Sequence, residues 1–333
     1  MGDHESGEVK VKDQPSKAQR TIHIVVAVLA VVVLPVVLLD VFVAHFCAQA
    51  MFIGVVFGVI GSLIGGTRRM LYVVPWFGLA AGLGAFTAYG WWWAVLLSLL
   101  GVLAAGGLYW GWLPTLLMLP FAATFASRVS SGRDAAVYGV IAGIATAYGI
   151  VLARRFEAPE QIEGLPISFS QAAVVAILFG IALGASASIA VAFGWKEPYW
   201  IPEPILILTL YLIIGKGERI RQKALATAFG VILVVPVAVL ALPTGANSAI
   251  AATAFVVALT QLKRYWLYYT LYTFALVLTL STPGNGATEA VQRGAEILAG
   301  IAILVLGLAV VHVLGVSLSK HYPQPELAGP TAP

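Results

Sequence analysis

Charged residues are scarce in this chain: Asp, Glu, Lys and Arg make up only 10% of its 333 residues. A soluble domain of this size carries roughly a quarter charged residues. The net charge of +4 comes from basic residues scattered between apolar segments, which form no continuous basic patch. The composition therefore argues against a soluble globular protein and against binding to nucleic acid.

Residues that hold metals or form disulfides are also few. The single cysteine, Cys47, excludes an internal disulfide framework and a cysteine-based metal site. The histidines show no metal-ligand spacing, and Gly215-Lys216-Gly217 lacks the leading glycine and the Ser/Thr of a phosphate-binding loop. No nucleophile constellation is present either. We therefore expect no cofactor, no enzymatic activity and no transport driven by ATP from this chain alone.

What the chain has instead is apolar sequence. Hydrophobic residues make up 60% of it, and the mean hydropathy is +0.93. Runs of about 20 apolar residues, each long enough for a hydrocarbon core of roughly 30 Å, recur throughout. Membrane strands would need alternating segments instead of solid runs such as 22–39. The pattern predicts an all-α, polytopic helical bundle embedded in a lipid bilayer.

We expect about twelve transmembrane helices. The predicted spans are 22–45, 47–65, 70–89, 91–109, 112–127, 134–153, 169–194, 200–215, 221–242, 245–261, 264–281 and 293–318. Glycines four residues apart, as in Gly78-x-x-x-Gly82 and Gly139-x-x-x-Gly143, predict helices that approach one another closely.

Basic residues in the short loops predict the orientation, because positive charge accumulates on the cytoplasmic side. With the amino terminus inside, the cytoplasmic loops hold Arg68-Arg69, Arg154-Arg155 and the hinge from Lys216 to Lys223. We therefore expect both termini to be cytoplasmic. The first span is long and lacks a small-residue cleavage site, which favours a retained helix over a removed signal peptide.

The chain is predicted to contain two parallel six-helix repeats. The first is expected over 21–153 and the second over 169–319, with a cytoplasmic linker at 154–168 and disordered cytoplasmic tails at 1–20 and 320–333. In both halves an apolar span ends in glycine and runs into a basic turn, with Arg69 and Arg219 in register. Six helices per half give both halves the same orientation.

The second half is similar to a known family. Pro198-Tyr199-Trp200-Ile201-Pro202 opens a span, a Gly-turn-Arg hinge follows, and Gly230 lies inside the next helix. These features resemble the fusaric acid resistance-like (FUSC) membrane domain of the aromatic acid exporter superfamily, best over about 170–318. The resemblance implies efflux of small aromatic or organic acids across a bacterial inner membrane. Many members carry a sizeable soluble domain after six helices, for which this chain has only 154–167 and a short tail.

Ionisable residues inside spans are functional candidates, because burying a charge in hydrocarbon costs at least ~2.5–3.5 kcal/mol. Asp40, Glu203 and Glu296 are each predicted near the outer boundary, where water or headgroups could equally well solvate them. Glu296 has Arg293 three residues before it, which explains it as a local helix pair. Glu203 stands between two prolines, and we expect it to couple proton uptake to export.

The basic hinges provide a second set of candidates. Arg69, Arg219 and Arg221 are predicted at the cytoplasmic mouth, where a guanidinium could recruit organic anions. The preference for positive charge inside predicts arginines there with no such role.

Phenols are the third set. Tyr265, Tyr268, Tyr269 and Tyr272 share one face of the eleventh span and are candidates to line a pathway for aromatic substrates. Anchoring of aromatic rings at the headgroups is the competing interpretation.

Taken together, the residues favour a secondary transporter that exports small organic anions, and coupling to protons is compatible with this function. A passive anion channel or facilitator of the same fold is the nearest alternative. A non-transporting membrane component of an envelope assembly is another, and homo-oligomerisation is compatible with each of them.

Overall fold

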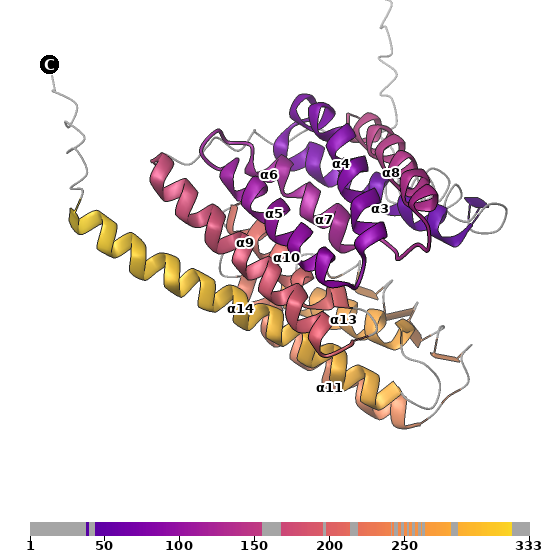
Figure 1. Ribbon diagram of the computed structural model, residues 1–333. Helices are drawn as coiled ribbons and strands as arrows, with labels where there is room; N and C mark the ends of the chain where they lie inside the picture. Colours follow the sequence, from indigo (N-terminus) through magenta and orange to yellow (C-terminus); the bar gives the residue numbers. More distant parts are fainter. Residues whose placement is uncertain are drawn as a thin grey trace, which may run out of the picture.

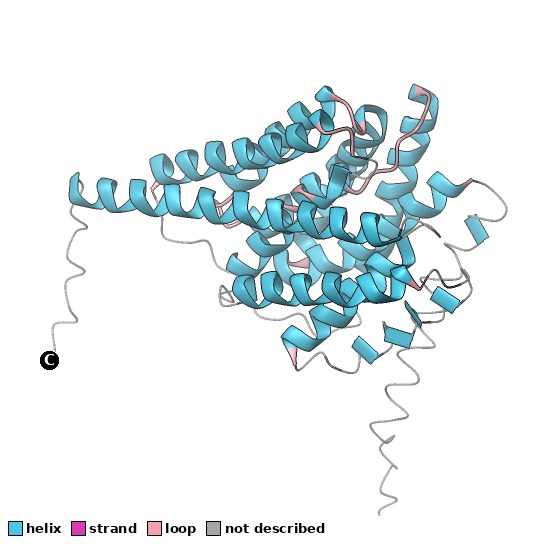
Figure 2. Ribbon diagram, turned by 90° about the horizontal axis from the view of Figure 1, so that it is seen from below, coloured by secondary structure: helices cyan, strands magenta, loops and turns pink. Residues whose placement is uncertain are grey.

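The computed structural model describes residues 38–39, 44–154, 168–195, 198–213, 219–240, 264–280 and 286–321, together with short pieces between 242 and 261. All regular structure in these residues is helical (Figure 2). The predicted all-α class is confirmed. Asp40, most of the predicted span 22–45 and much of the predicted span 245–261 lie outside the described residues.

The first half of the chain forms a bundle of helices that pack side by side (Figure 1). Its elements are α3 (His45–Gly65), α4 (Thr67–Thr87), α5 (Trp91–Gly106), α6 (Leu113–Leu116), α7 (Met118–Thr124) and α8 (Gly132–Ala153).

The second half adds helices that pack along this bundle and on one another (Figure 1). Its elements are α9 (Phe169–Ala192), η2 (Pro198–Trp200), α10 (Pro202–Ile213), α11 (Arg219–Val239), α13 (Tyr265–Leu280) and α14 (Gly286–His321).

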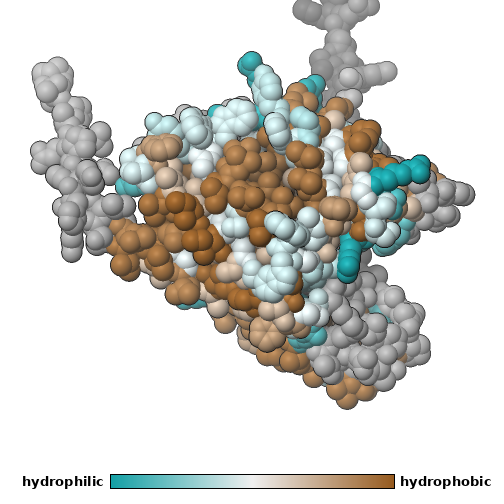
Figure 3. Space-filling model, in the orientation of Figure 1, coloured by the Kyte–Doolittle hydropathy of each residue, from teal (hydrophilic) through white to brown (hydrophobic). Residues whose placement is uncertain are grey.

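Among the described residues, five helices are long and apolar enough to cross a membrane: His45–Gly65, Thr67–Thr87, Gly132–Ala153, Phe169–Ala192 and Val291–Leu314. Large apolar side chains are exposed along these and neighbouring helices, and hydrophobic surface dominates much of the face in Figure 3. Such a surface is stable against lipid and unfavourable in water. The structure is that of a multi-pass membrane protein.

Serine caps determine where two of these helices begin. The Ser131 side chain accepts a hydrogen bond from the Asp134 backbone at the start of α8. Ser168 and Gln171 form a reciprocal capping box at the start of α9. These contacts satisfy backbone N–H groups that a helix start leaves without partners. An N–H group without a partner is costly near lipid.

Glycine allows α4 and α8 to pack backbone to backbone. A Cβ atom built on Gly78 would lie 2.7 Å from the Gly139 carbonyl oxygen, and one on Gly139 would lie 2.6 Å from that of Gly78. Any larger residue would push the helices apart, because such separations are below van der Waals contact. The predicted close approach through Gly78-x-x-x-Gly82 and Gly139-x-x-x-Gly143 is confirmed.

The predicted span 112–127 is wrong as a continuous transmembrane helix. The residues form two short pieces, α6 and α7, and every residue of α7 is buried. Pro120 has no N–H with which to continue the hydrogen-bond ladder. From Leu113 to Thr124 the pair reaches about 18 Å at ~1.5 Å per residue, which is too short for a bilayer core.

The predicted span 200–215 is also a short, buried helix. α10 has 12 residues, and Ile205, Leu206 and Leu208 are completely buried in the main core cluster. The rings of Phe125, just after α7, and Tyr199, just before α10, lie 5.7 Å apart. Two short apolar helices therefore meet inside the molecule, surrounded by longer ones.

α14 is longer than predicted. It has 36 residues, about 54 Å at ~1.5 Å per residue, and extends beyond the rest of the bundle (Figure 1). Its first part packs on α9, α10 and α11. This contact brings α14 to the start of α10, where the charged residues described next are found.

Candidate functional site

Four charged residues are buried in the described part of the chain: Glu203, Lys223, Arg293 and Glu296. All four belong to α10, α11 and α14. Buried ions in a membrane protein are expensive unless they are paired, so they mark a region whose polarity serves a purpose beyond packing.

Glu203 pairs with Lys223 across two helices. The Nζ atom of Lys223 lies 3.4 Å from Oε1 of Glu203, and the two side chains are 5% and 12% exposed. Glu203 occupies the first turn of α10, directly after Pro202, which has no N–H to satisfy at this helix start. The carboxylate and the ammonium neutralise each other in a setting that excludes most water.

This ion pair corrects the predicted positions of the two residues. Glu203 was expected at the outer boundary, and Lys223 in an inward hinge on the opposite side of the membrane. Two residues in contact at 3.4 Å lie at one depth, whereas a hydrocarbon core is roughly 30 Å thick. The prediction that placed them on opposite faces is wrong, and Glu203 has the partner that the sequence did not reveal.

Lys223 also faces α13. Its Nζ atom lies 5.3 Å from the centre of the Tyr269 ring, a cation–π distance. A Cβ atom on Gly230 would contact Thr270 and Thr273, and Val234 packs with Phe274 and Val277. α11 and α13 therefore run side by side in the same direction, polar near their starts and apolar further on.

Thr227 lies on this same face of α11, one turn after Lys223. It is 1% exposed, and its hydroxyl has no hydrogen-bond partner among the described residues. The hydroxyl of Thr270, opposite on α13, donates to the carbonyl oxygen of Trp266 in its own helix. Thr227 is thus a buried donor that the described part of the chain does not satisfy.

Three tyrosines of α13 form a ring cluster. The ring centroids of Tyr268 and Tyr269 are 5.0 Å apart, and those of Tyr268 and Tyr272 are 5.9 Å apart. Tyr269 is buried beneath Lys223, while Tyr268 and Tyr272 are half-buried. The side chain of Tyr265 lies outside the described residues.

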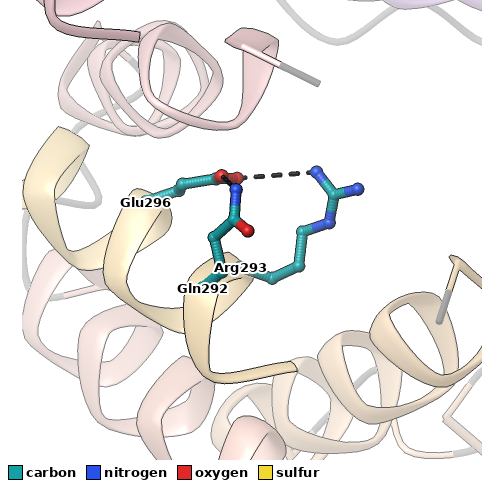
Figure 4. A network of polar contacts seen from close by, with 3 residues as sticks. All are labelled: Gln292, Arg293 and Glu296. Atoms are coloured by element: carbon teal, nitrogen blue, oxygen red, sulfur yellow. Dashed lines mark hydrogen bonds and ion pairs between the residues drawn. The ribbon is translucent and has the colours of Figure 1, made fainter. Parts of the chain in front are cut away.

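The second ion pair lies within α14 (Figure 4). A guanidinium nitrogen of Arg293 is 3.5 Å from Oε2 of Glu296, and the Gln292 amide donates to Oε1 at 2.7 Å. The Arg293 guanidinium lies 5.4 Å from the Trp200 ring centre. The predicted local pair is confirmed, but the interfacial interpretation is wrong because the Glu296 side chain is 0% exposed.

The predicted basic residues are not brought together. Arg69 donates a hydrogen bond to the Gly111 carbonyl at 2.7 Å and lies 5.9 Å from the Trp112 ring centre. This tethers the loop after α5 to the start of α4. Arg221 is exposed at the start of α11, and the side chain of Arg219 lies outside the described residues.

Sequence reasoning missed Lys223, Thr227 and the burial of Glu296. The available signals were the spacing of Arg293 and Glu296 and the presence of Lys223 two residues inside a predicted span. Neither signal identifies a partner on another helix.

The buried charges do not lie in the two hollows described at the surface. A groove of about 590 Å³ follows the α4–α8 contact, and a hollow of about 710 Å³ lies beside Tyr89, Trp92 and Arg128. Neither is lined by the buried charges. The buried charges supply carboxylates and an ammonium, and the side chains beside them add the Thr227 hydroxyl and phenol rings. Groups of these kinds suit anion binding and proton transfer.

Residues 184–307 match the family described as fusaric acid resistance protein-like. The match runs from within α9 to within α14 and includes all four buried charges. The predicted resemblance is confirmed. No curated protein and no solved structure matches the chain significantly.

Proposed function

We propose that this chain, a multi-pass membrane protein with a fusaric acid resistance-like segment, is a secondary transporter. It exports small aromatic or organic acids across a bacterial inner membrane and couples their movement to protons. The observation that carries the proposal is the buried pair of Glu203 and Lys223, which joins α10 to α11 inside a bundle that faces lipid.

A buried carboxylate can accept a proton, and a buried ammonium can bind an anion. Both properties are needed to couple protons to the movement of organic acids. Short helices that end inside the membrane are a recurrent feature of substrate sites in secondary transporters. The short buried helices α7 and α10 have this character, and Glu203 lies in the first turn of α10.

The same proposal includes the architecture of two parallel repeats, 21–153 and 169–319, of six helical segments each, of which 112–127 and 200–215 are the short buried ones. The tails 1–20 and 320–333 are then cytoplasmic. Support comes from corresponding contacts, because α4 meets α8 near Gly78 and Gly139 while α11 meets α14 near Val231 and Gly294. The contact lies at a similar distance from the helix starts in both halves.

Arg221, exposed at the start of α11, and Arg219 beside it are the candidates for recruiting anions in this scheme. Asp40 remains a candidate for proton uptake. Arg69 also donates a hydrogen bond to the Gly111 carbonyl, so it has a structural contact in addition to the proposed recruitment of anions.

The test is flux in proteoliposomes that hold the purified full chain under an imposed pH gradient. Benzoate and fusaric acid serve as aromatic substrates and acetate as the aliphatic comparison. We expect uphill movement of an aromatic carboxylate in the wild type and loss of that movement in Glu203→Gln. Arg68→Ala, an exposed substitution outside the site, is the control.

Two alternatives give different results in this assay. Downhill flux that ignores the pH gradient would make the protein a facilitator. Absence of flux from well-folded protein would contradict transport and favour a membrane component of an envelope assembly, which a stable partner complex would then identify.

A further inference from the structure

We propose that Lys223 is the carboxylate-binding residue of this protein and that Glu203 holds its place as an intramolecular substitute for the bound anion. Protonation of Glu203 releases Lys223, and the carboxylate of the substrate then takes the position of the Glu203 carboxylate. The inference rests on the proposed transport function and adds the residue that binds the substrate.

The first observation is that the pair is loose. Charge-assisted hydrogen bonds between ammonium and carboxylate groups are typically ~2.7–2.9 Å long. Lys223 and Glu203 are 3.4 Å apart and share one oxygen. Arg293 and Glu296 are as far apart, at 3.5 Å, but Glu296 also accepts a hydrogen bond from the Gln292 amide at 2.7 Å. Two buried charges with so long a contact can exchange one partner for a better one.

The second observation is the unused hydroxyl of Thr227. It lies one turn from Lys223 on the same helix face, is buried, and has no partner among the described residues. Buried donors are nearly always satisfied in folded proteins, so such a group indicates a missing acceptor. A carboxylate has two oxygens, and one can contact Lys223 while the other accepts from Thr227.

The third observation concerns the body of the ligand. The Tyr269 ring packs under the Lys223 ammonium, and the Tyr268 and Tyr272 rings adjoin it. Aromatic rings pair with one another in offset or edge-to-face contacts. The rings beside Lys223 therefore have the chemistry that packs against a monocarboxylate with a flat apolar body.

Charge balance links the anion to the proton. Ionisable side chains on the elements packed around Glu203 are few, and among the described residues α7 and α9 contribute no charged group. Arg293 and Glu296 compensate each other, so Lys223 needs a single negative partner. That partner is either ionised Glu203 or the substrate, which predicts one proton bound with each carboxylate, so that the two cross the membrane in the same direction. The titratable side chains on these packed elements include Lys223 on α11, Tyr269 on α13, Tyr199 on η2, and Arg293 and Glu296 on α14.

The experiment measures benzoate binding to the purified full chain by titration calorimetry at a series of pH values from about 5 to about 8. In the wild type we expect affinity to fall as pH rises, because ionised Glu203 competes for Lys223. Glu203→Gln keeps the shape and removes the competitor. We expect it to bind benzoate about tenfold more tightly near pH 8, with the pH dependence lost.

Two further variants isolate the binding residues. The double variant Glu203→Gln with Lys223→Met leaves no unpaired charge, so it is expected to fold and to lose benzoate binding. Thr227→Val should weaken binding about threefold to tenfold, whereas the matched Thr270→Val, whose hydroxyl bonds within its own helix, should not change it.

The outcomes separate this inference from the transport function. Wild-type affinity and pH dependence in Glu203→Gln, or full binding in the double variant, would overturn the role of Lys223 even if proton-driven flux is observed. Tighter, pH-independent binding in Glu203→Gln supports the role of Lys223 even if the wild type shows no flux, in which case only the transport proposal falls.

Discussion

The two halves of the molecule bury polarity in different ways. In the first half, from α3 to α8, the buried polar side chains among the described residues are hydroxyls, and the helices meet through glycine. In the second half, α10, α11 and α14 bury four charges. Both halves have apolar outer surfaces, so the lipid does not impose this difference. The first half is built for close packing, and the second keeps charges at the cost of stability.

The two ion pairs of the second half differ in what holds their partners together. Arg293 and Glu296 lie three residues apart on one helix, and Gln292 reinforces them. Such a pair persists as long as the helix does. Glu203 and Lys223 lie on separate helices and depend on the packing of α10 against α11. A movement of α10 relative to α11 would break the pair of Glu203 and Lys223 and leave the pair of Arg293 and Glu296 intact.

The largest expected effect is in Lys223→Met. It leaves the Glu203 carboxylate buried without its partner, which typically costs about 3–5 kcal/mol. Reversible unfolding in mixed detergent micelles measures this loss. Adding Glu203→Gln should recover most of the stability. If the single variant were as stable as the wild type, the pair would not be buried as described.

A smaller effect is expected in the first half for Gly78→Ala. Its Cβ atom would lie 2.7 Å from the Gly139 carbonyl oxygen. Such overpacking typically lowers the free energy of unfolding by about 1–3 kcal/mol. The same unfolding assay applies. Gly106→Ala is the matched control, because nothing lies within 4 Å of its Cβ position. Equal stability of the two variants would contradict the close contact of α4 and α8.

The smallest effect is expected in Arg69→Ala. Loss of the hydrogen bond to the Gly111 carbonyl should cost about 1–2 kcal/mol, because the guanidinium is only partly buried. Arg68→Ala, the exposed neighbour, should stay within about 0.5 kcal/mol of the wild type. Protease sensitivity of the loop after α5 provides a second measurement. Normal stability with reduced anion affinity would instead favour the recruiting role of Arg69.

Local patterns predicted those features that depend on neighbours along the chain. The apolar runs at 47–65 and 70–89 indicated helices, the glycine spacing in α4 and α8 indicated close packing, and Arg293 indicated a helix partner for Glu296. The same patterns failed at 112–127, because hydropathy does not distinguish a helix that faces lipid from one buried among other helices. All of α7 is of the second kind.

By itself, the sequence determined that this protein is helical, lies in a membrane and resembles the fusaric acid resistance-like family. These properties follow from composition and short-range order, which every segment carries within itself. Only the tertiary structure decided that Glu203 meets Lys223, that Glu296 is fully buried, and that Thr227 has no hydrogen-bond partner among the residues that the structure describes. Those contacts depend on how separate helices pack, and hydropathy along one segment contains no information about the helix that lies beside it.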